Sequence, residues 1–278
     1  MIHQTKVDII GFARRALLAA SFAGVASVVM PVSEAGADTL NIGFIFGGDL
    51  TYDYFINTIA EDATKFGPGG VVDVDFNFTL EPAAGTFSDY DVIFSSALNQ
   101  ASSVRNELTA FWEAGGHVVN FGEVESFIGF AVDNLGLGIG QQCCSINAAF
   151  PTGNGENRLD ADGPFGSEPD GTVTFSAGNT LSGDFSLGTI ALDDGSGNAT
   201  AAYWEADILG AGTGAVIVLA DSNILTDDSN VIQDNVTFAS NLLAFLAEEE
   251  FGGAVIPTPG GLGLMAVALL AARVARRC

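Results

Sequence analysis

The stretch that decides the fold is YDVIFSSALNQASSVRNELTAFWEAGGHVVNFGE, residues 90–123. Residues 90–96 are a short apolar run, which is typical of a buried strand. Residues 101–116 place apolar side chains at helical spacing and end in Gly-Gly, which indicates an amphipathic helix that stops there. Residues 117–123 form a second apolar run. A strand, a helix and a further strand in this order predict a parallel α/β unit.

The sequence on either side repeats this alternation. Upstream, residues 39–48 are apolar and end in Gly-Gly, residues 53–66 have helical spacing, and residues 71–80 alternate as a strand does. Downstream, residues 214–225 predict a strand that runs into a polar loop, and residues 235–249 predict a helix. We therefore expect an α/β fold with a mostly parallel sheet and helices on both faces.

Residues 150–210 differ from the rest, because they are rich in Gly, Asp, Asn, Ser and Thr and contain only short β-like pieces. We interpret them as a loop-rich β insertion. Within it, residues 193–198 lack the alternating Asp ligands and the closing Glu of an EF-hand, and a turn there needs no ligand. The three cysteines have no metal-ligand spacing. We expect no cofactor, and the alternative is a calcium site in the acidic loops at 160–170, 193–198 and 221–230.

The charge of the chain is strongly one-sided. Its 278 residues include 34 Asp and Glu against 9 Lys and Arg, and six of the basic residues lie before residue 38 or after residue 250. Such an acidic body repels phosphate backbones, which excludes nucleic-acid binding. The same charge suits a solvated surface or, as an alternative, a matrix component that depends on divalent cations.

The order of these elements resembles the class I glutamine amidotransferase-like fold, over residues 39–135 and 212–248. The elements are the quoted strand, the helix that ends in Gly-Gly, the next strand, and the late strand and helix. The resemblance implies a domain of amidotransferase-like or flavodoxin-like architecture over residues 38–250. In amidotransferases a cysteine nucleophile follows the strand after the Gly-Gly helix, and that position is Gly122 here. His117 is the only histidine expected in the mature chain, so a nucleophile would lack its usual base. We therefore expect no enzymatic activity.

Open α/β sheets bind ligands at the carboxyl ends of their strands. The polar side chains at the predicted strand ends are the candidate ligand-binding residues: Asp49, Ser95, Asn120, Glu123, Asp221 and Asn223. These residues favour a binding or structural module. The alternative is a carboxylate-based hydrolase of an extracellular polymer, in which Glu123, Glu125 and Asp221 serve as acid and base.

Residues 1–37 predict a secretory signal peptide with an apolar region at 16–32. The basic residues before that region and the small residues at the cleavage site are Lys6, Arg14, Arg15, Ala35 and Ala37. The mature protein is then expected to begin at Asp38, with the export machinery and signal peptidase as partners. An uncleaved N-terminal anchor is the alternative.

Residues 251–278 predict a sorting tail with a short hydrophobic helix. From residue 255 the tail resembles the PEP-CTERM sorting signals of bacteria, in which Pro-Glu-Pro precedes an apolar helix and an arginine cluster. The positions that carry the resemblance are Pro257, Thr258, Pro259, Arg273, Arg276 and Arg277, with Thr258 in place of the usual Glu. The resemblance implies processing by an exosortase-type peptidase.

The apolar run of the tail, residues 260–272, is shorter than the roughly 20 residues of a free-standing transmembrane helix. A run of this length is expected to hold the protein at the membrane at least transiently, with the basic end on the cytoplasmic side. We therefore expect an exported protein at the cell surface or outside the cell. A simple C-terminal anchor is the alternative.

Overall fold

The computed structural model describes residues 37–46, 52–96, 102–122, 128–135, 137, 140–142, 148–151, 157–166, 173–174, 180–221, 225 and 233–252. The predicted signal peptide up to residue 36, the adjacent Cys143 and Cys144, and the predicted tail from residue 253 lie outside the described residues. Within the described ranges, no helix combines the length and the apolar character that crossing a bilayer requires.

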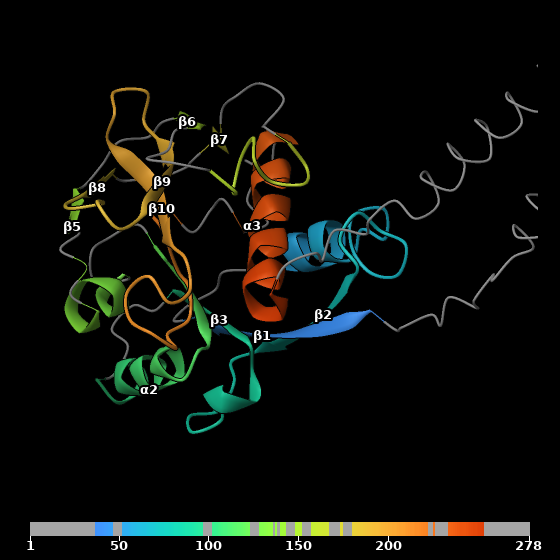
Figure 1. Cartoon of the computed structure of the whole chain (residues 1–278), viewed down its shortest axis with the longest axis horizontal. Helices are drawn as coiled ribbons and strands as arrows, with labels where there is room; N and C mark the ends of the chain where they lie inside the picture. The colour runs from blue at the N-terminus through green and yellow to red at the C-terminus, as the bar shows by residue number, and fades with distance from the viewer. Residues whose placement is uncertain are drawn as a thin grey trace, which may run out of the picture. The chain divides into compact units, whose positions relative to one another are not determined.

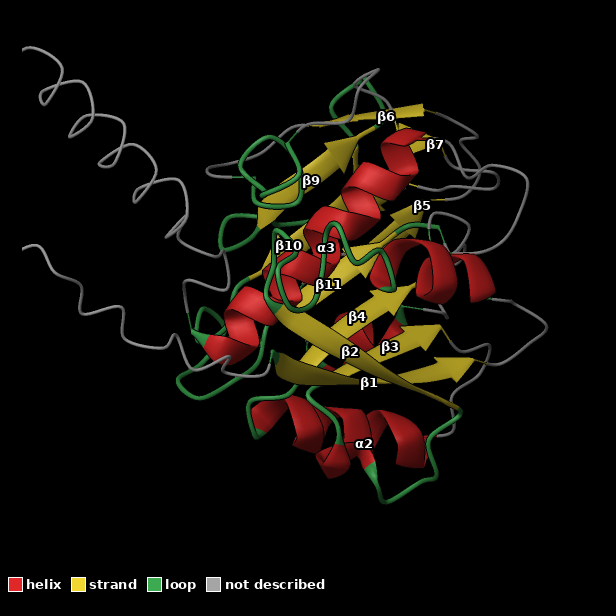
Figure 2. Cartoon of the chain, turned by 90° about the vertical axis from the view of Figure 1, so that its right-hand side faces the viewer, coloured by secondary structure: helices red, strands yellow, loops and turns green. Residues whose placement is uncertain are grey.

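The centre of the fold is a mixed sheet whose first five strands run parallel, in the order β2-β1-β3-β4-β11 (Figure 2). These strands are β1 (Asp38–Phe46), β2 (Val74–Leu80), β3 (Val92–Ser96), β4 (His117–Phe121) and β11 (Val216–Leu219). Every residue of β3, β4 and β11 is buried, which explains their continuous apolar sequences. The predicted α/β class and its parallel strands are confirmed in this part of the sheet.

The same sheet continues beyond β11 with antiparallel strands. β10 (Ala199–Trp204) pairs with β11 and with β9 (Thr189–Asp193). Four short strands complete the sheet: β5 (Gly140–Gln142), β6 (Ala148–Pro151), β7 (Val173–Thr174) and β8 (Thr180–Ser182). All of these strands lie between β4 and β11 in the sequence, and Figure 1 shows β5 to β9 gathered around β10, away from β1, β2 and β3. The β-rich segment thus adds strands to the main sheet.

Among the described residues, the helical elements pack into two hydrophobic cores. These elements are the helices α2 (Ser102–Glu113) and α3 (Gln233–Phe251) and the short helical turns η1 (Phe55–Ala60), η2 (Phe87–Asp89) and η3 (Phe130–Asn134). The first core unites α3 and η1 with strand side chains such as Phe94. The second core unites α2 and η3 with strand side chains such as Ile93. Neighbouring strand residues enter different cores because successive side chains of a strand point in opposite directions.

Aromatic rings fill much of the first core. The ring centroid of Phe44 lies 4.7 Å from that of Phe94, 5.1 Å from Tyr52, 5.8 Å from Phe78 and 6.0 Å from Phe55. Each such pair contributes about 0.5–1.5 kcal/mol beyond the area that it buries. This cluster accounts for part of the high phenylalanine content of the chain, 21 residues.

One predicted helix is much shorter than expected. The spacing of residues 53–66 predicts a helix over the whole segment, whereas η1 spans only Phe55–Ala60. Beyond it, Asp62 Oδ1 accepts the backbone N–H of Thr64 at 3.0 Å and its hydroxyl at 2.6 Å. A side chain that bonds the backbone in this way stabilises a turn in competition with the helix.

A tight glycine turn ends α2 and fixes the start of two strands. Gly115 has a φ of 103°, and the N–H of Gly116 donates to Phe111 O at 3.0 Å. The Trp112 carbonyl accepts the N–H of Gly214 at 3.0 Å, and the indole Nε1 of Trp112 donates to Gly214 O at 2.7 Å. A Cβ on Gly214 would overlap the carbonyl of Gly116. The two backbones therefore touch where β4 and β11 begin.

Candidate functional site

The carboxyl ends of the parallel strands bring two of the predicted site residues into contact. Ser95 of β3 lies opposite Asn120 of β4 in the sheet register, and both are completely buried. Asn120 Nδ2 donates to Ser95 O at 3.0 Å, and Asn120 Oδ1 accepts the N–H of Ala131 at 3.2 Å. The side chain of Asn120 therefore joins β3 to η3 at this edge of the sheet.

Asp221 follows β11 at the same edge and is also completely buried. It has a bonding partner, as a carboxylate removed from water requires. The three described candidates therefore belong to the interior of the protein rather than to an open surface. The remaining candidates, Asp49, Glu123 and Asn223, lie outside the described residues.

Tyr52 adds a hydroxyl group that the sequence pattern did not single out. Its ring centroid lies 5.1 Å from that of Phe44 and 6.1 Å from that of Phe121, near the end of β4. Burial and, to a smaller extent, the charge of Glu81 raise the pKa of Tyr52 well above its usual range. A phenol in this environment keeps its proton, so it is unsuited to act as a base.

The nucleophile position of the amidotransferase-like fold and the one histidine of the body lie at opposite ends of β4. Gly122 follows the strand, and its N–H donates to Leu219 O at 3.2 Å. His117 is the first residue of the strand, and its side chain is 3 % exposed. Its Nδ1 accepts the N–H of Ala215 at 2.9 Å, and its Nε2 lies 3.4 Å from Glu250 Oε2.

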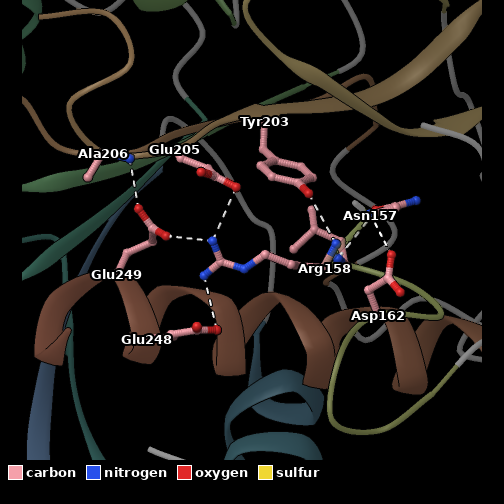
Figure 3. A network of polar contacts seen from close by, with 9 residues as sticks. Asn157, Arg158, Asp162, Tyr203, Glu205, Ala206, Glu248 and Glu249 are labelled. Carbon is pink, nitrogen blue, oxygen red and sulfur yellow. Dashed lines mark hydrogen bonds and ion pairs between the residues drawn. The ribbon is translucent and has the colours of Figure 1, made fainter. Parts of the chain in front are cut away.

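A second polar centre surrounds Arg158, next to α3 (Figure 3). Arg158 Nη1 lies 2.9 Å from Glu249 Oε1 and 3.2 Å from Glu205 Oε1. Arg158 Nη2 lies 3.0 Å from Glu248 Oε2. The guanidinium carbon also lies 4.5 Å from the centroid of the Phe245 ring, a cation–π distance. Because the Arg158 side chain is only 15 % exposed, these contacts are partly shielded from water.

Burial and charge act in opposite directions on this guanidinium. Burial lowers the pKa of Arg158, but the charges of Glu248, Glu249 and Glu205 and the hydrogen bond to Glu249 outweigh it and raise the pKa. Three carboxylates face one cation, so the centre keeps an excess of negative charge. This charge repels an anionic ligand, and the ion pairs of the centre join segments of the fold that are distant in sequence.

The same centre fixes backbone segments as well as side chains (Figure 3). Glu249 Oε2 accepts the N–H of Ala206 at 2.7 Å, just after β10. The backbone N–H of Arg158 donates to the Tyr203 hydroxyl at 3.0 Å. The last turns of α3 thus hold both β10 and the segment 157–166.

Asn241 of α3 is the second anchor of the segment 157–166. The Asn241 side chain is completely buried. Its Oδ1 accepts the N–H of Phe165 at 3.1 Å, and its Nδ2 donates to Asp160 O at 3.2 Å and to Gly166 O at 2.9 Å. One amide therefore satisfies three backbone groups, which would otherwise be buried without partners.

No family model matches the chain, and no curated protein matches it. Among solved structures, the mmIFT52 N-terminal domain is similar to it with a TM-score of 0.52 at 12 % identity. The match covers 75 % of this chain and 97 % of that domain. At this identity the similarity shows the fold alone.

Two further solved structures are similar at lower TM-scores. A putative ThuA-like protein from Parabacteroides merdae has a TM-score of 0.43 at 11 % identity, over 80 % of this chain and 94 % of that one. The exo-β-1,4-mannosidase Op5Man5 from Opitutaceae bacterium strain TAV5 has a TM-score of 0.39 at 11 % identity, over 86 % of this chain and 38 % of that one. Similarities of this size support no statement about function.

The sequence contained one signal for the Arg158 centre. Arg158 is one of three basic residues between positions 38 and 250, together with Lys65 and Arg105. An isolated cation in so acidic a chain is expected to attract carboxylates from elsewhere in the fold. Lys65 also contacts α3, but through a hydroxyl group, since its Nζ donates to Ser240 Oγ at 2.9 Å. Burial lowers the pKa of Lys65, and the charge of Asp62 opposes this effect.

Proposed function

We propose that this chain is an exported, non-catalytic α/β module that serves as a binding or structural unit at the cell surface. In the proposed arrangement, helices cover both faces of an amidotransferase-like sheet over residues 38–250. The presence of α3 in the first core and of α2 in the second supports this arrangement. Figure 2 agrees with it, because α3 and α2 lie on different sides of the parallel strands.

The observation that carries the non-catalytic assignment is the separation of Gly122 and His117. Five residues of extended chain span about 16 Å. A base must lie within hydrogen-bond reach of the group that it activates. Gly122 has no side chain to activate, and His117 faces Ala215 and Glu250 instead. Both features argue against acyl transfer at this strand end.

Purified protein is expected to hydrolyse no glutamine, and Gly122→Cys is expected to gain no such activity. The new thiol would stand at the family position, but the only histidine between residues 38 and 250 would remain at the far end of β4. Ammonia release from glutamine measures both proteins. Activity above buffer in the unchanged protein would refute the non-catalytic proposal, and activity gained only by Gly122→Cys would show that a base reaches the site from elsewhere.

The proposed localisation rests on the two ends of the sequence rather than on the described residues. Residues 1–37 are proposed to direct export through signal peptidase, and residues 255–278 to direct sorting by an exosortase-type peptidase. The acidic body between them carries 32 Asp and Glu against 3 Lys and Arg, which suits a soluble domain outside the membrane.

Deletion of residues 255–278 is expected to release the protein into the medium, because the apolar run and the arginines at positions 273, 276 and 277 would no longer hold it at the membrane. Cell fractionation with an antibody against the body measures the distribution. The matched control replaces the three arginines by glutamine and leaves the apolar run in place. Unchanged attachment after the full deletion would contradict the sorting proposal.

A further inference from the structure

We propose that a cavity at the amino-terminal edge of the parallel strands binds an organic cation, an ammonium or guanidinium group on an apolar stem. The cavity has a volume of about 580 Å³ and lies between the segment 85–91, the second half of α2 with its glycine turn, and Glu250 of α3. Its volume falls within the range of about 300–1,000 Å³ that is typical of small-molecule sites. The inference rests on the proposed binding role and is independent of export.

Three carboxylates line this cavity, and each comes from a different element. Glu107 belongs to α2, Asp91 precedes β3, and Glu250 lies in the last turn of α3. Among the described residues that line the cavity there is no lysine or arginine. Within this set of residues the three carboxylates therefore have no balancing cation, in contrast to the three glutamates that surround Arg158.

Two of the carboxylates are fixed in place by backbone groups. Glu107 Oε1 accepts the N–H of Gly85 at 2.7 Å and the N–H of Phe87 at 3.3 Å. Asp91 Oδ2 accepts the backbone N–H of Asn41 at 2.7 Å and its Nδ2 at 3.0 Å. In each case one oxygen of the carboxylate is held by the fold, so the carboxylate has a fixed position at the wall of the cavity. Preorganised acceptors of this kind lower the cost of binding a cation.

The third carboxylate, Glu250, lies in front of an unsatisfied buried donor. The Nδ1 of His117 accepts the Ala215 N–H, so the proton of the neutral ring is on Nε2. Among the residues that the structure describes, this nitrogen has no hydrogen-bond partner; the side chain is 3 % exposed, and Nε2 points toward Glu250 Oε2 at 3.4 Å. An unsatisfied buried donor is rare in folded proteins. A ligand that draws Glu250 into a fixed position would allow this hydrogen bond to form.

The remaining walls suit the apolar stem of such a cation. Phe87 and Phe111 are both buried at the cavity, and Tyr90 lies beside them half-buried. Aromatic faces attract ammonium and guanidinium groups in addition to burying their stems. Among the residues that the structure describes, no set of three or more His, Cys, Asp and Glu side chains could hold a metal ion. The separated carboxylates therefore favour an extended organic cation over a metal ion.

Calorimetric titration of the purified protein with 1,5-diaminopentane tests the proposal, at an ionic strength held constant with NaCl. Saturable binding is expected. Glu250→Gln is expected to weaken it about tenfold, the effect of losing one charge-assisted hydrogen bond. Glu113→Gln is the matched control, because Glu113 is exposed on α2 outside the cavity and its loss removes the same charge. Binding should be unchanged in that variant.

A second variant separates shape from charge. Ala110→Leu places a larger side chain in the cavity on an exposed position of α2, where leucine is a good helix former. It should abolish binding while circular dichroism shows an intact fold. The absence of saturable binding would overturn the proposal. Equal weakening of binding by Glu250→Gln and Glu113→Gln would also overturn it, because the diamine would then be attracted only diffusely by an acidic surface. Tighter binding of a lysine-containing tripeptide than of the diamine would identify a protein side chain as the source of the cation, and the reverse order would identify a free amine.

Discussion

Replacing Arg158 by alanine is expected to lower the free energy of unfolding by about 3 kcal/mol, because it leaves shielded carboxylates without their counter-charge. Glu249 is the partner most affected, since its side chain is only 10 % exposed. Glu205 and Glu248 are about half exposed, so water replaces part of what the guanidinium supplied. Urea-induced unfolding at neutral pH measures the change.

A double-mutant cycle separates the charge contact from the loss of packing. In a Glu249→Gln background, Arg158→Ala should lower the free energy of unfolding by less than it does in the unchanged protein, because the most buried carboxylate has already been replaced by a neutral amide. Arg158→Lys keeps one charge but cannot reach three carboxylates at once, so an intermediate stability is expected. An Arg158→Ala variant as stable as the unchanged protein would show that the centre does not hold β10 to α3.

Gly214→Ala is expected to destabilise the fold by at least about 3 kcal/mol, the upper range of overpacking effects. The new Cβ would overlap the backbone carbonyl of Gly116, and no side-chain rotation can relieve a clash with backbone. The two turns would have to separate, which also breaks the two hydrogen bonds between Gly214 and Trp112. Thermal unfolding followed by circular dichroism measures the loss.

Gly212→Ala serves as the matched control for this clash. A Cβ at Gly212 meets no atom within 4 Å, but the residue has a φ of 83°. A non-glycine residue in this conformation costs about 1–2 kcal/mol. Gly212→Ala should therefore be clearly more stable than Gly214→Ala. Equal losses for the two variants would mean that the chain relieves the contact between the new Cβ at position 214 and the Gly116 carbonyl at little cost.

Local patterns predicted the parallel part of the sheet because its strands and α2 have their own signals. The apolar run at residues 90–96, the helical spacing of α2 and its Gly-Gly end are all properties of consecutive residues. The same kind of pattern overestimated the length of η1, because the turn at Asp62 depends on side-chain hydrogen bonds that the spacing of apolar residues does not reveal. Ser95, Asn120 and Asp221 were correctly expected at strand ends, but their complete burial depends on what covers those ends.

The polar anchors of α3 could not be predicted in this way. Arg158 and Glu249 are 91 residues apart, and Asn241 and Asp160 are 81 residues apart. Contacts over such separations depend on the tertiary arrangement of the β-rich segment and α3, which local sequence patterns do not contain. The cavity with Asp91, Glu107 and Glu250 is of the same kind, because its carboxylates are brought together by three elements that are distant in sequence.

The distribution of aromatic residues between the two cores also determines which part of the protein its intrinsic fluorescence reports on. Both tryptophans of the chain, Trp112 and Trp204, belong to the second core, which contains α2. The first core, with α3, relies on phenylalanine and tyrosine. Emission excited at the red edge of the indole band therefore reports on the α2 side alone. A loosening of the phenylalanine cluster around Phe44 would be optically silent at that wavelength, so the chain carries a natural label on one of its two cores.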